Sequence, residues 1–137
     1  MILLGYDLTG YDLAVCTIKN SFTNSNTFTF MNSTITLVSN TYQVSVANKT
    51  KVGCKTFYSN KGQETATVYL TDVELKGRTQ KAFALAAYKA QNGDSGCLVF
   101  CPNNNQAVGI HVADGNNGYS AYLPCKYINM KFGTLPK

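Results

Sequence analysis

The strongest constraint on the fold is a series of short strand-forming segments that follow one another through most of the chain. They are rich in β-branched and aromatic residues, and turn-forming residues separate them at Asn48, Asn60–Gly62 and Lys76–Gly77. No stretch shows long helical periodicity, so we expect an all-β antiparallel barrel. The expected strands are Tyr42–Val46, Lys51–Tyr58, Thr65–Leu70, Val73–Leu75, Ala82–Ala90, Leu98–Cys101, Ala107–Val112 and Tyr119–Leu123.

The composition fits one soluble domain. Of the 137 residues, 45% are apolar, which is enough to bury a core. No apolar run has membrane-spanning length, and Met1–Gly5 lacks the basic leader of a signal peptide. Five cysteines form an odd set without a close Cys-x-x-Cys pair, which favours reduced thiols in a cytosolic compartment. We therefore expect a soluble protein with no membrane partner.

The segment Asn92–Phe100 places a small nucleophile between two glycines and then enters an apolar strand. Gly93 and Gly96 let the backbone turn tightly, which exposes Ser95 Oγ and aims consecutive N–H groups at one point. An oxyanion hole is built in this way, with the N–H groups of Gly93 and Ser95 as donors and that of Asp94 nearby. The alternative is an ordinary Gly-Asp-Ser-Gly turn between two strands.

The only histidine of the chain, His111, lies in Ala107–Gly115, and Asn116–Gly118 and Tyr119–Leu123 follow it. Together with the segment around Ser95, this region resembles the C-terminal barrel of the 3C-type (picornain) main proteases of picornaviruses and related positive-strand RNA viruses. Members of that family read Gly-x-Cys-Gly, or Gly-x-Ser-Gly in serine variants, followed by Gly-x-His and a glycine-rich hairpin. By this resemblance Ser95 matches the nucleophile, and His111 matches the histidine that lines the S1 pocket.

The resemblance implies a chymotrypsin-like antiparallel double β-barrel, of which the first barrel is incomplete in this sequence. Residues 1–22 are expected to be the end of the N-terminal barrel, and residues 23–40 the interbarrel connection. Residues 41–137 are expected to form the C-terminal barrel, with the nucleophile loop and the S1 pocket. Picornain-like domains also imply a short C-terminal helix within Pro124–Phe132.

Asp12 matches the acid of a catalytic triad in this resemblance, because it opens the strand-forming run in Gly10–Ile18. The alternative is a turn or capping carboxylate at the start of a strand. Asp7 lies in a similar Gly-Tyr-Asp-Leu repeat and is the main competitor, but Leu8–Gly10 breaks the strand behind it. Asp12 is therefore the candidate acid.

The family's order is histidine, acid, nucleophile, yet no histidine precedes Asp12. Either the strands that carry the base were left out of the sequence, or the protein has lost the base and is a non-catalytic relative. We favour the first interpretation, because the missing strands would leave an apolar sheet edge unpaired. A third interpretation makes His111 the base for Ser95, and a hydrogen-bonded core histidine is the general alternative.

The resemblance implies an S1 pocket formed by His111 with Ala90, Gly109, Val112 and Ala113. A neutral imidazole N–H can donate to the side-chain carbonyl of a P1 glutamine, whereas a protonated imidazole favours glutamate. The family commonly has a threonine five residues before the nucleophile, where this chain has Ala90. We therefore expect less strict selectivity for glutamine, because the pocket has one donor fewer.

A structural zinc site is not expected. Related 2A-type proteases carry a cysteine and a histidine shortly after the nucleophile, and Cys101 lies at a comparable place. However, Pro102 and Asn103 follow it, so the four ligands of such a site are not assembled. We expect neither a metal nor another cofactor.

The predicted function is an endopeptidase that processes a viral polyprotein in the host-cell cytoplasm. Ser95, which stands where most relatives have cysteine, would attack the peptide bond after a P1 glutamine or glutamate. The alternative is a catalytically inactive protease-fold module that binds viral RNA or polyprotein. With a net charge of +5, a lysine patch with interleaved aromatic residues suggests RNA as a partner. The alternative is a solvated strand face, and the basic RNA-contact motif of the family, which would fall near Lys19–Phe22, is not matched. The patch comprises Lys49, Lys51, Lys55, Phe57, Tyr58 and Lys61.

Overall fold

A computed structural model of the chain describes residues 3–7, 9–16, 25–38, 50–56, 65–114 and 118–132. The expected strand Tyr42–Val46 and the turns at Asn48 and Asn60–Gly62 lie outside these residues. The described strands and helix are β1 Leu3–Asp7, β2 Leu13–Cys16, β3 Thr27–Phe30, β4 Ser33–Thr36, β5 Lys51–Cys54, β6 Ala66–Val73, β7 Phe83–Ala86, β8 Leu98–Cys101, β9 Gln106–Asp114, β10 Ser120–Pro124 and α1 Cys125–Phe132.

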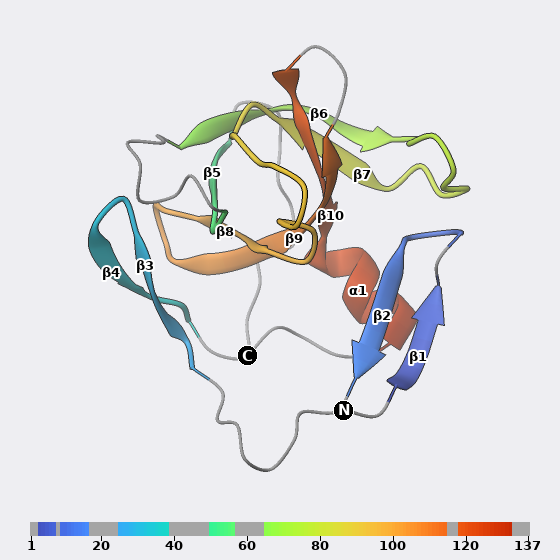
Figure 1. The fold of residues 1–137 in the computed structure, drawn as a ribbon, viewed down its shortest axis with the longest axis horizontal. Coiled ribbons are helices and arrows are strands. Elements are labelled where there is room, and N and C mark those ends of the chain that lie inside the picture. The colour runs from blue at the N-terminus through green and yellow to red at the C-terminus, as the bar shows by residue number, and fades with distance from the viewer. Residues whose placement is uncertain are drawn as a thin grey trace.

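Six of these strands close into an antiparallel barrel with the order β10-β7-β6-β5-β8-β9 (Figure 1). The predictions of an all-β fold, of one antiparallel barrel and of a short C-terminal helix are confirmed, whereas the described residues form no second barrel. The expected strand Thr65–Leu70 is part of a longer strand, β6, which ends at Val73, so the separate strand expected at Val73–Leu75 is not found. The pairing of β6 with β7 shifts register twice. Such irregularities bend a strand and help a small barrel to close.

Alternation along the strands places one face inside the barrel. In β6, Ala66 and Val68 are buried whereas Thr67 and Tyr69 are exposed, as the period of two requires. The centre is filled by aromatic and β-branched side chains together with small ones, which is how a six-stranded barrel avoids internal voids. The buried cluster comprises Val52, Cys54, Ala66, Val68, Ala84, Ala86, Tyr88, Val99, Cys101, Val108 and Tyr122.

The N-terminal hairpin of β1 and β2 packs against the barrel beside α1 (Figure 1). Leu13 is buried in a cluster with Phe83 of β7 and Ile128 of α1, and the rings of Tyr11 and Tyr127 lie 5.7 Å apart. Within the described residues, β1 and β2 pair only with each other. This two-stranded sheet is the structure of the segment that the sequence assigned to the end of a first barrel.

The segment expected to be a plain interbarrel connection contains a second hairpin, β3–β4, on the other side of the barrel (Figure 1). Its turn residues, Met31 and Asn32, have φ values of 50° and 62°, as type I′ hairpin turns require. Phe28 and Phe30 both meet the ring of Phe100 edge-on, with centroids 5.1 and 4.9 Å away. The hairpin is thereby tied to the barrel core.

Candidate active site

The loop that carries Ser95 is held by the buried side chain of Asp94. The Gln91 N–H donates to Asp94 Oδ2 at 2.9 Å, and the Cys97 N–H donates to the Asp94 carbonyl at 3.0 Å. Gly93 and Gly96 have φ values of 98° and 91°, a backbone conformation that is freely available to glycine alone. The two glycines therefore act as the sequence predicted, by allowing a tight turn on each side of Ser95.

Asp94→Ala is expected to lower the free energy of unfolding by about 1.5 kcal/mol, because it removes a charge-assisted hydrogen bond from a short loop. Asp94→Asn is the matched control, since its amide oxygen can still accept from the Gln91 N–H. Urea denaturation of both variants measures the difference. Equal stability of Asp94→Ala and the parent protein would show that the carboxylate does not hold the loop.

Two backbone hydrogen bonds join the loop to His111 of β9. The Gly96 N–H donates to the His111 carbonyl, and the His111 N–H donates to the Cys97 carbonyl, both at 2.8 Å. Ser95 Oγ donates to the Val112 carbonyl at 3.1 Å. Ser95 is exposed as a residue, and this hydrogen bond fixes the direction of its hydroxyl.

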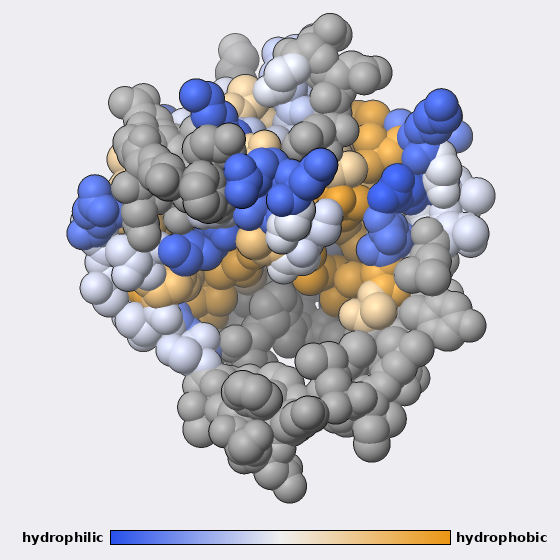
Figure 2. Space-filling view, in the orientation of Figure 1, coloured by the Kyte–Doolittle hydropathy of each residue, from blue (hydrophilic) through white to orange (hydrophobic). Residues whose placement is uncertain are grey.

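A pocket of about 380 Å³ lies between the N-terminal hairpin and the barrel. Figure 2 shows apolar surface between these two parts of the molecule. Both Asp12 and Ser95 line the pocket, although they lie 83 positions apart in the sequence. The lining residues are Asp12, Leu13, Ala14, Ser95, Gly96, Ile110, His111, Val112 and Leu123. The structure thus brings the candidate nucleophile and the candidate acid to one cavity.

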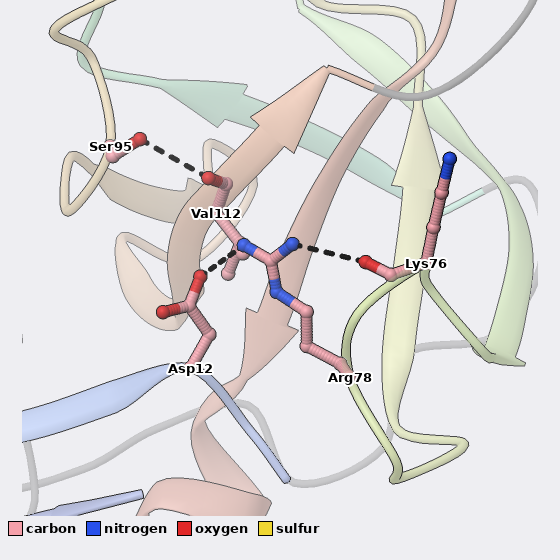
Figure 3. A network of polar contacts seen from close by, with 5 residues as sticks. All are labelled: Asp12, Lys76, Arg78, Ser95 and Val112. Carbon is pink, nitrogen blue, oxygen red and sulfur yellow. Dashed lines mark hydrogen bonds and ion pairs between the residues drawn. The ribbon is translucent and has the colours of Figure 1, made fainter. Parts of the chain in front are cut away.

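Asp12 forms an ion pair with Arg78, from Oδ2 to Nη2 (Figure 3). Arg78 Nη1 also donates to the Lys76 carbonyl at 3.2 Å. The Asp12 backbone has a φ of 58°, which aspartate tolerates better than most residues. The sequence did not predict the Arg78 contact, because the segment between β6 and β7 carries no local signal that it faces the N-terminal turn.

His111 is buried, with only 3% of its surface exposed, and its Nδ1 lies 2.8 Å from the Tyr88 hydroxyl. The two rings are 5.5 Å apart in a T-shaped arrangement. Among the described residues, Ser95 Oγ has the Val112 carbonyl as its partner, not the imidazole. This geometry fits a wall of the pocket better than a base for Ser95.

Tyr88 is the site residue that sequence reasoning missed. The sequence placed it only near the end of the expected strand Ala82–Ala90, whereas β7 ends at Ala86. It could have been found because Tyr88 lies two residues after Ala86, and residues two apart in an extended segment share a face. Tyr88 is therefore expected inside the barrel with Ala86, where a tyrosine hydroxyl requires a hydrogen-bond partner. Buried hydroxyls on both sides hold this segment: Ser120 Oγ donates to the Tyr88 carbonyl at 2.8 Å, and Thr56 Oγ1 donates to the Lys89 carbonyl at 2.9 Å.

The three N–H groups predicted to form the oxyanion hole differ in whether they already have an acceptor. The Asp94 N–H donates to the Gln91 carbonyl at 3.1 Å, which removes it from the set. No hydrogen bond from the N–H of Gly93 or Ser95 to another residue of the described ranges is present. Gly93 and Ser95 therefore remain as the pair of candidate donors.

Only part of the expected S1 wall faces this pocket. His111 and Val112 line it, whereas Gly109 packs against Leu123 and Tyr122 inside the barrel wall. Ala90 and Ala113 are partly buried against apolar clusters. Gly109, Ala90 and Ala113 are not among the residues that line this pocket.

Cys97, two residues after Ser95, does not compete as a nucleophile. Burial raises the pKa of its thiol, and the Asp94 carboxylate raises it further. Burial also raises the pKa of the neighbouring Cys54 thiol. Both thiols therefore remain protonated at neutral pH, whereas the thiolate is the reactive form.

In the described ranges, no three His, Cys, Asp or Glu side chains converge to hold a metal ion.

Comparisons with protein-family models, with curated protein sequences and with solved structures gave no match for this chain. Among the residues that the structure describes, no helix has the length and apolar character to cross a membrane.

Proposed function

We propose that this chain is the nucleophile-bearing part of a chymotrypsin-like endopeptidase of the 3C type that cleaves a viral polyprotein. The observation that carries the proposal is the shared pocket of Ser95 and Asp12, which is also lined by Val112, whose carbonyl accepts from Ser95 (Figure 3). In this proposal the six-stranded barrel is the second of two, and β1–β2 is the end of the first.

Ser95 is the nucleophile of the proposed reaction. Its Oγ attacks the substrate carbonyl, and the Gly93 and Ser95 N–H groups stabilise the oxyanion that forms. A base must take the hydroxyl proton, and an acid must orient that base. Asp12 is the proposed acid, since its carboxylate lines the pocket into which Ser95 opens.

The base is an imidazole supplied to this pocket from outside the residues given. The one histidine of the sequence is buried, and the Ser95 hydroxyl donates to the Val112 carbonyl and not to its ring. An imidazole between Asp12 and Ser95 would accept the Ser95 proton at one nitrogen and donate to the carboxylate from the other. The Ser95 hydroxyl would then exchange the Val112 carbonyl for the imidazole.

The proposed substrate preference is glutamine at P1, with glutamate accepted. If the Tyr88 hydroxyl donates to His111 Nδ1, the imidazole proton lies on Nε2. A neutral Nε2–H donates to the carbonyl of a glutamine amide. Since Ala90 supplies no hydroxyl, this single donor discriminates only moderately.

The proposal is tested by labelling Ser95 with a fluorophosphonate in the presence of increasing imidazole, followed by mass spectrometry of the labelled peptide. We expect the labelling rate to rise with imidazole, because free imidazole can replace a missing base. Ser95→Ala is the control for labelling elsewhere. Labelling of Ser95 that is independent of imidazole and no faster than that of exposed serines elsewhere in the chain would contradict the proposal.

The second candidate is an inactive protease-fold module that binds viral RNA or polyprotein. The observation that favours it is the Ser95 hydroxyl itself, which donates to a backbone carbonyl instead of a base. In that case Ser95 stays unlabelled at every imidazole concentration, while the chain retains a fluorescent single-stranded RNA or a polyprotein fragment in an anisotropy assay.

A further inference from the structure

The segment between β6 and β7 is fastened to the N-terminal turn at three points. The Thr79 N–H donates to the Thr9 carbonyl at 2.7 Å, and the Gln80 N–H approaches the Gly10 carbonyl at 3.4 Å. Next to these backbone contacts, the Arg78 guanidinium reaches the Asp12 carboxylate (Figure 3). The turn that carries Asp12 is therefore positioned by the barrel itself.

The Arg78 guanidinium bridges two acceptors on different segments. Nη2 contacts Asp12 Oδ2, and Nη1 donates to the Lys76 carbonyl. The guanidinium fork is planar and rigid, so fixing one nitrogen on Lys76 also fixes the direction from which the other approaches Asp12. The Arg78 and Asp12 side chains are 25% and 32% exposed, so the pair is partly shielded from water.

Arg78 contacts only one of the two carboxylate oxygens of Asp12. A carboxylate offers about four lone-pair sites, so it can hold Arg78 and a second donor together. Within the described part of the chain, Oδ1 of Asp12 has no hydrogen-bond partner, and Asp12 lines the pocket that Ser95 enters. The contact with Arg78 thus leaves Asp12 able to receive a donor from the pocket.

We propose that Arg78 is a positioning residue, which fixes the Asp12 carboxylate so that its second oxygen can orient an imidazole between Asp12 and Ser95. This inference rests on the proposed function. Asp12 has two rotatable side-chain bonds and lies on a small hairpin, so a fixed partner restricts where its oxygens lie. A catalytic group displaced by about 1 Å can lose on the order of 100-fold in rate.

The test compares imidazole-dependent labelling of Ser95 by a fluorophosphonate in the parent chain, Arg78→Met, Arg78→Lys and Asp12→Asn. We expect Arg78→Met to lower the slope of rate against imidazole concentration by about tenfold. Arg78→Lys keeps the charge but loses the fork, so it should recover only part of the slope. Lys81→Met is the matched control, because it removes an exposed charge from the same segment.

A positioning role also predicts that the effects of the Arg78 and Asp12 substitutions on the labelling rate do not add, and that only the imidazole-dependent part of the rate changes. The double variant Arg78→Met/Asp12→Asn should be no slower than Asp12→Asn alone, because Arg78 acts through Asp12. The imidazole-independent rate should stay unchanged in Arg78→Met, Arg78→Lys and Lys81→Met, whereas general loosening of the fold would change it. An unchanged or steeper slope in Arg78→Met overturns the inference while leaving the proposed function in place. Absence of imidazole-dependent labelling in the parent chain overturns both.

Discussion

Gly109→Ala is expected to lower the free energy of unfolding by about 3 kcal/mol, at the upper end of the usual cost of overpacking. A Cβ at Gly109 would run into the carbonyl of Leu123 and the ring of Tyr122, both fully buried in β10. A backbone carbonyl cannot rotate away, so β9 and β10 would have to separate. Equilibrium urea denaturation of the purified variant measures this loss.

The matched control for this prediction is Gly77→Ala. Nothing lies near a Cβ at Gly77, but its φ of 82° makes any side chain strained, at a cost of about 1 kcal/mol. The two variants therefore separate steric conflict from backbone strain. If Gly109→Ala cost no more than Gly77→Ala, close approach of β9 and β10 would not be a constraint on this barrel.

The same substitution also affects the candidate site. Gly109 precedes His111 by two residues in β9, and the strand continues to Val112, whose carbonyl accepts from Ser95. Separation of β9 from β10 would move both groups. We therefore expect any folded fraction of Gly109→Ala to show altered His111 signals in NMR spectra, in addition to its lower stability.

The sequence predicted the barrel strands well where apolar and β-branched residues are continuous or alternate. Leu98–Cys101 is found as predicted, and the expected Ala107–Val112 is the middle of β9. The hairpin β3–β4 was missed, although Thr27–Phe30 alternates threonine and phenylalanine with the period of a strand. Its abundant polar residues suggested a connection, because its apolar face becomes meaningful only when Phe100 is in place.

The candidate site was predictable in part for a similar reason. The turn around Ser95 is encoded locally by two glycines, so it could be predicted from a few residues. The contact between Asp12 and Arg78 joins residues 66 positions apart, and no local pattern specifies such a pairing. Tyr88 follows β7 and His111 lies in β9, so the two side chains meet only because both strands belong to one closed barrel. Long-range side-chain pairs of this kind follow from the register of the strands.

Tyr88→Phe is expected to lower the free energy of unfolding by about 2 kcal/mol. It should also allow the His111 imidazole to populate both tautomers. The variant removes one oxygen and leaves His111 Nδ1 buried without its partner, which is costlier than losing an exposed hydrogen bond. Because the chain has a single histidine, ¹⁵N spectra of the imidazole report its two nitrogens without overlap. We expect a proton on Nε2 in the parent protein and a mixture of tautomers in the variant.

Tyr69→Phe is the control for this substitution, because Tyr69 is half exposed on β6 and stacks on Tyr119, away from the imidazole. It should leave both the stability and the His111 signals unchanged. A proton on Nδ1 in the parent protein would contradict the proposed donation from Tyr88, because Nε2 would then be an acceptor. Such a pocket would favour a hydrogen-bond donor in its ligand, and the preference for the carbonyl of a P1 glutamine would lose its physical basis.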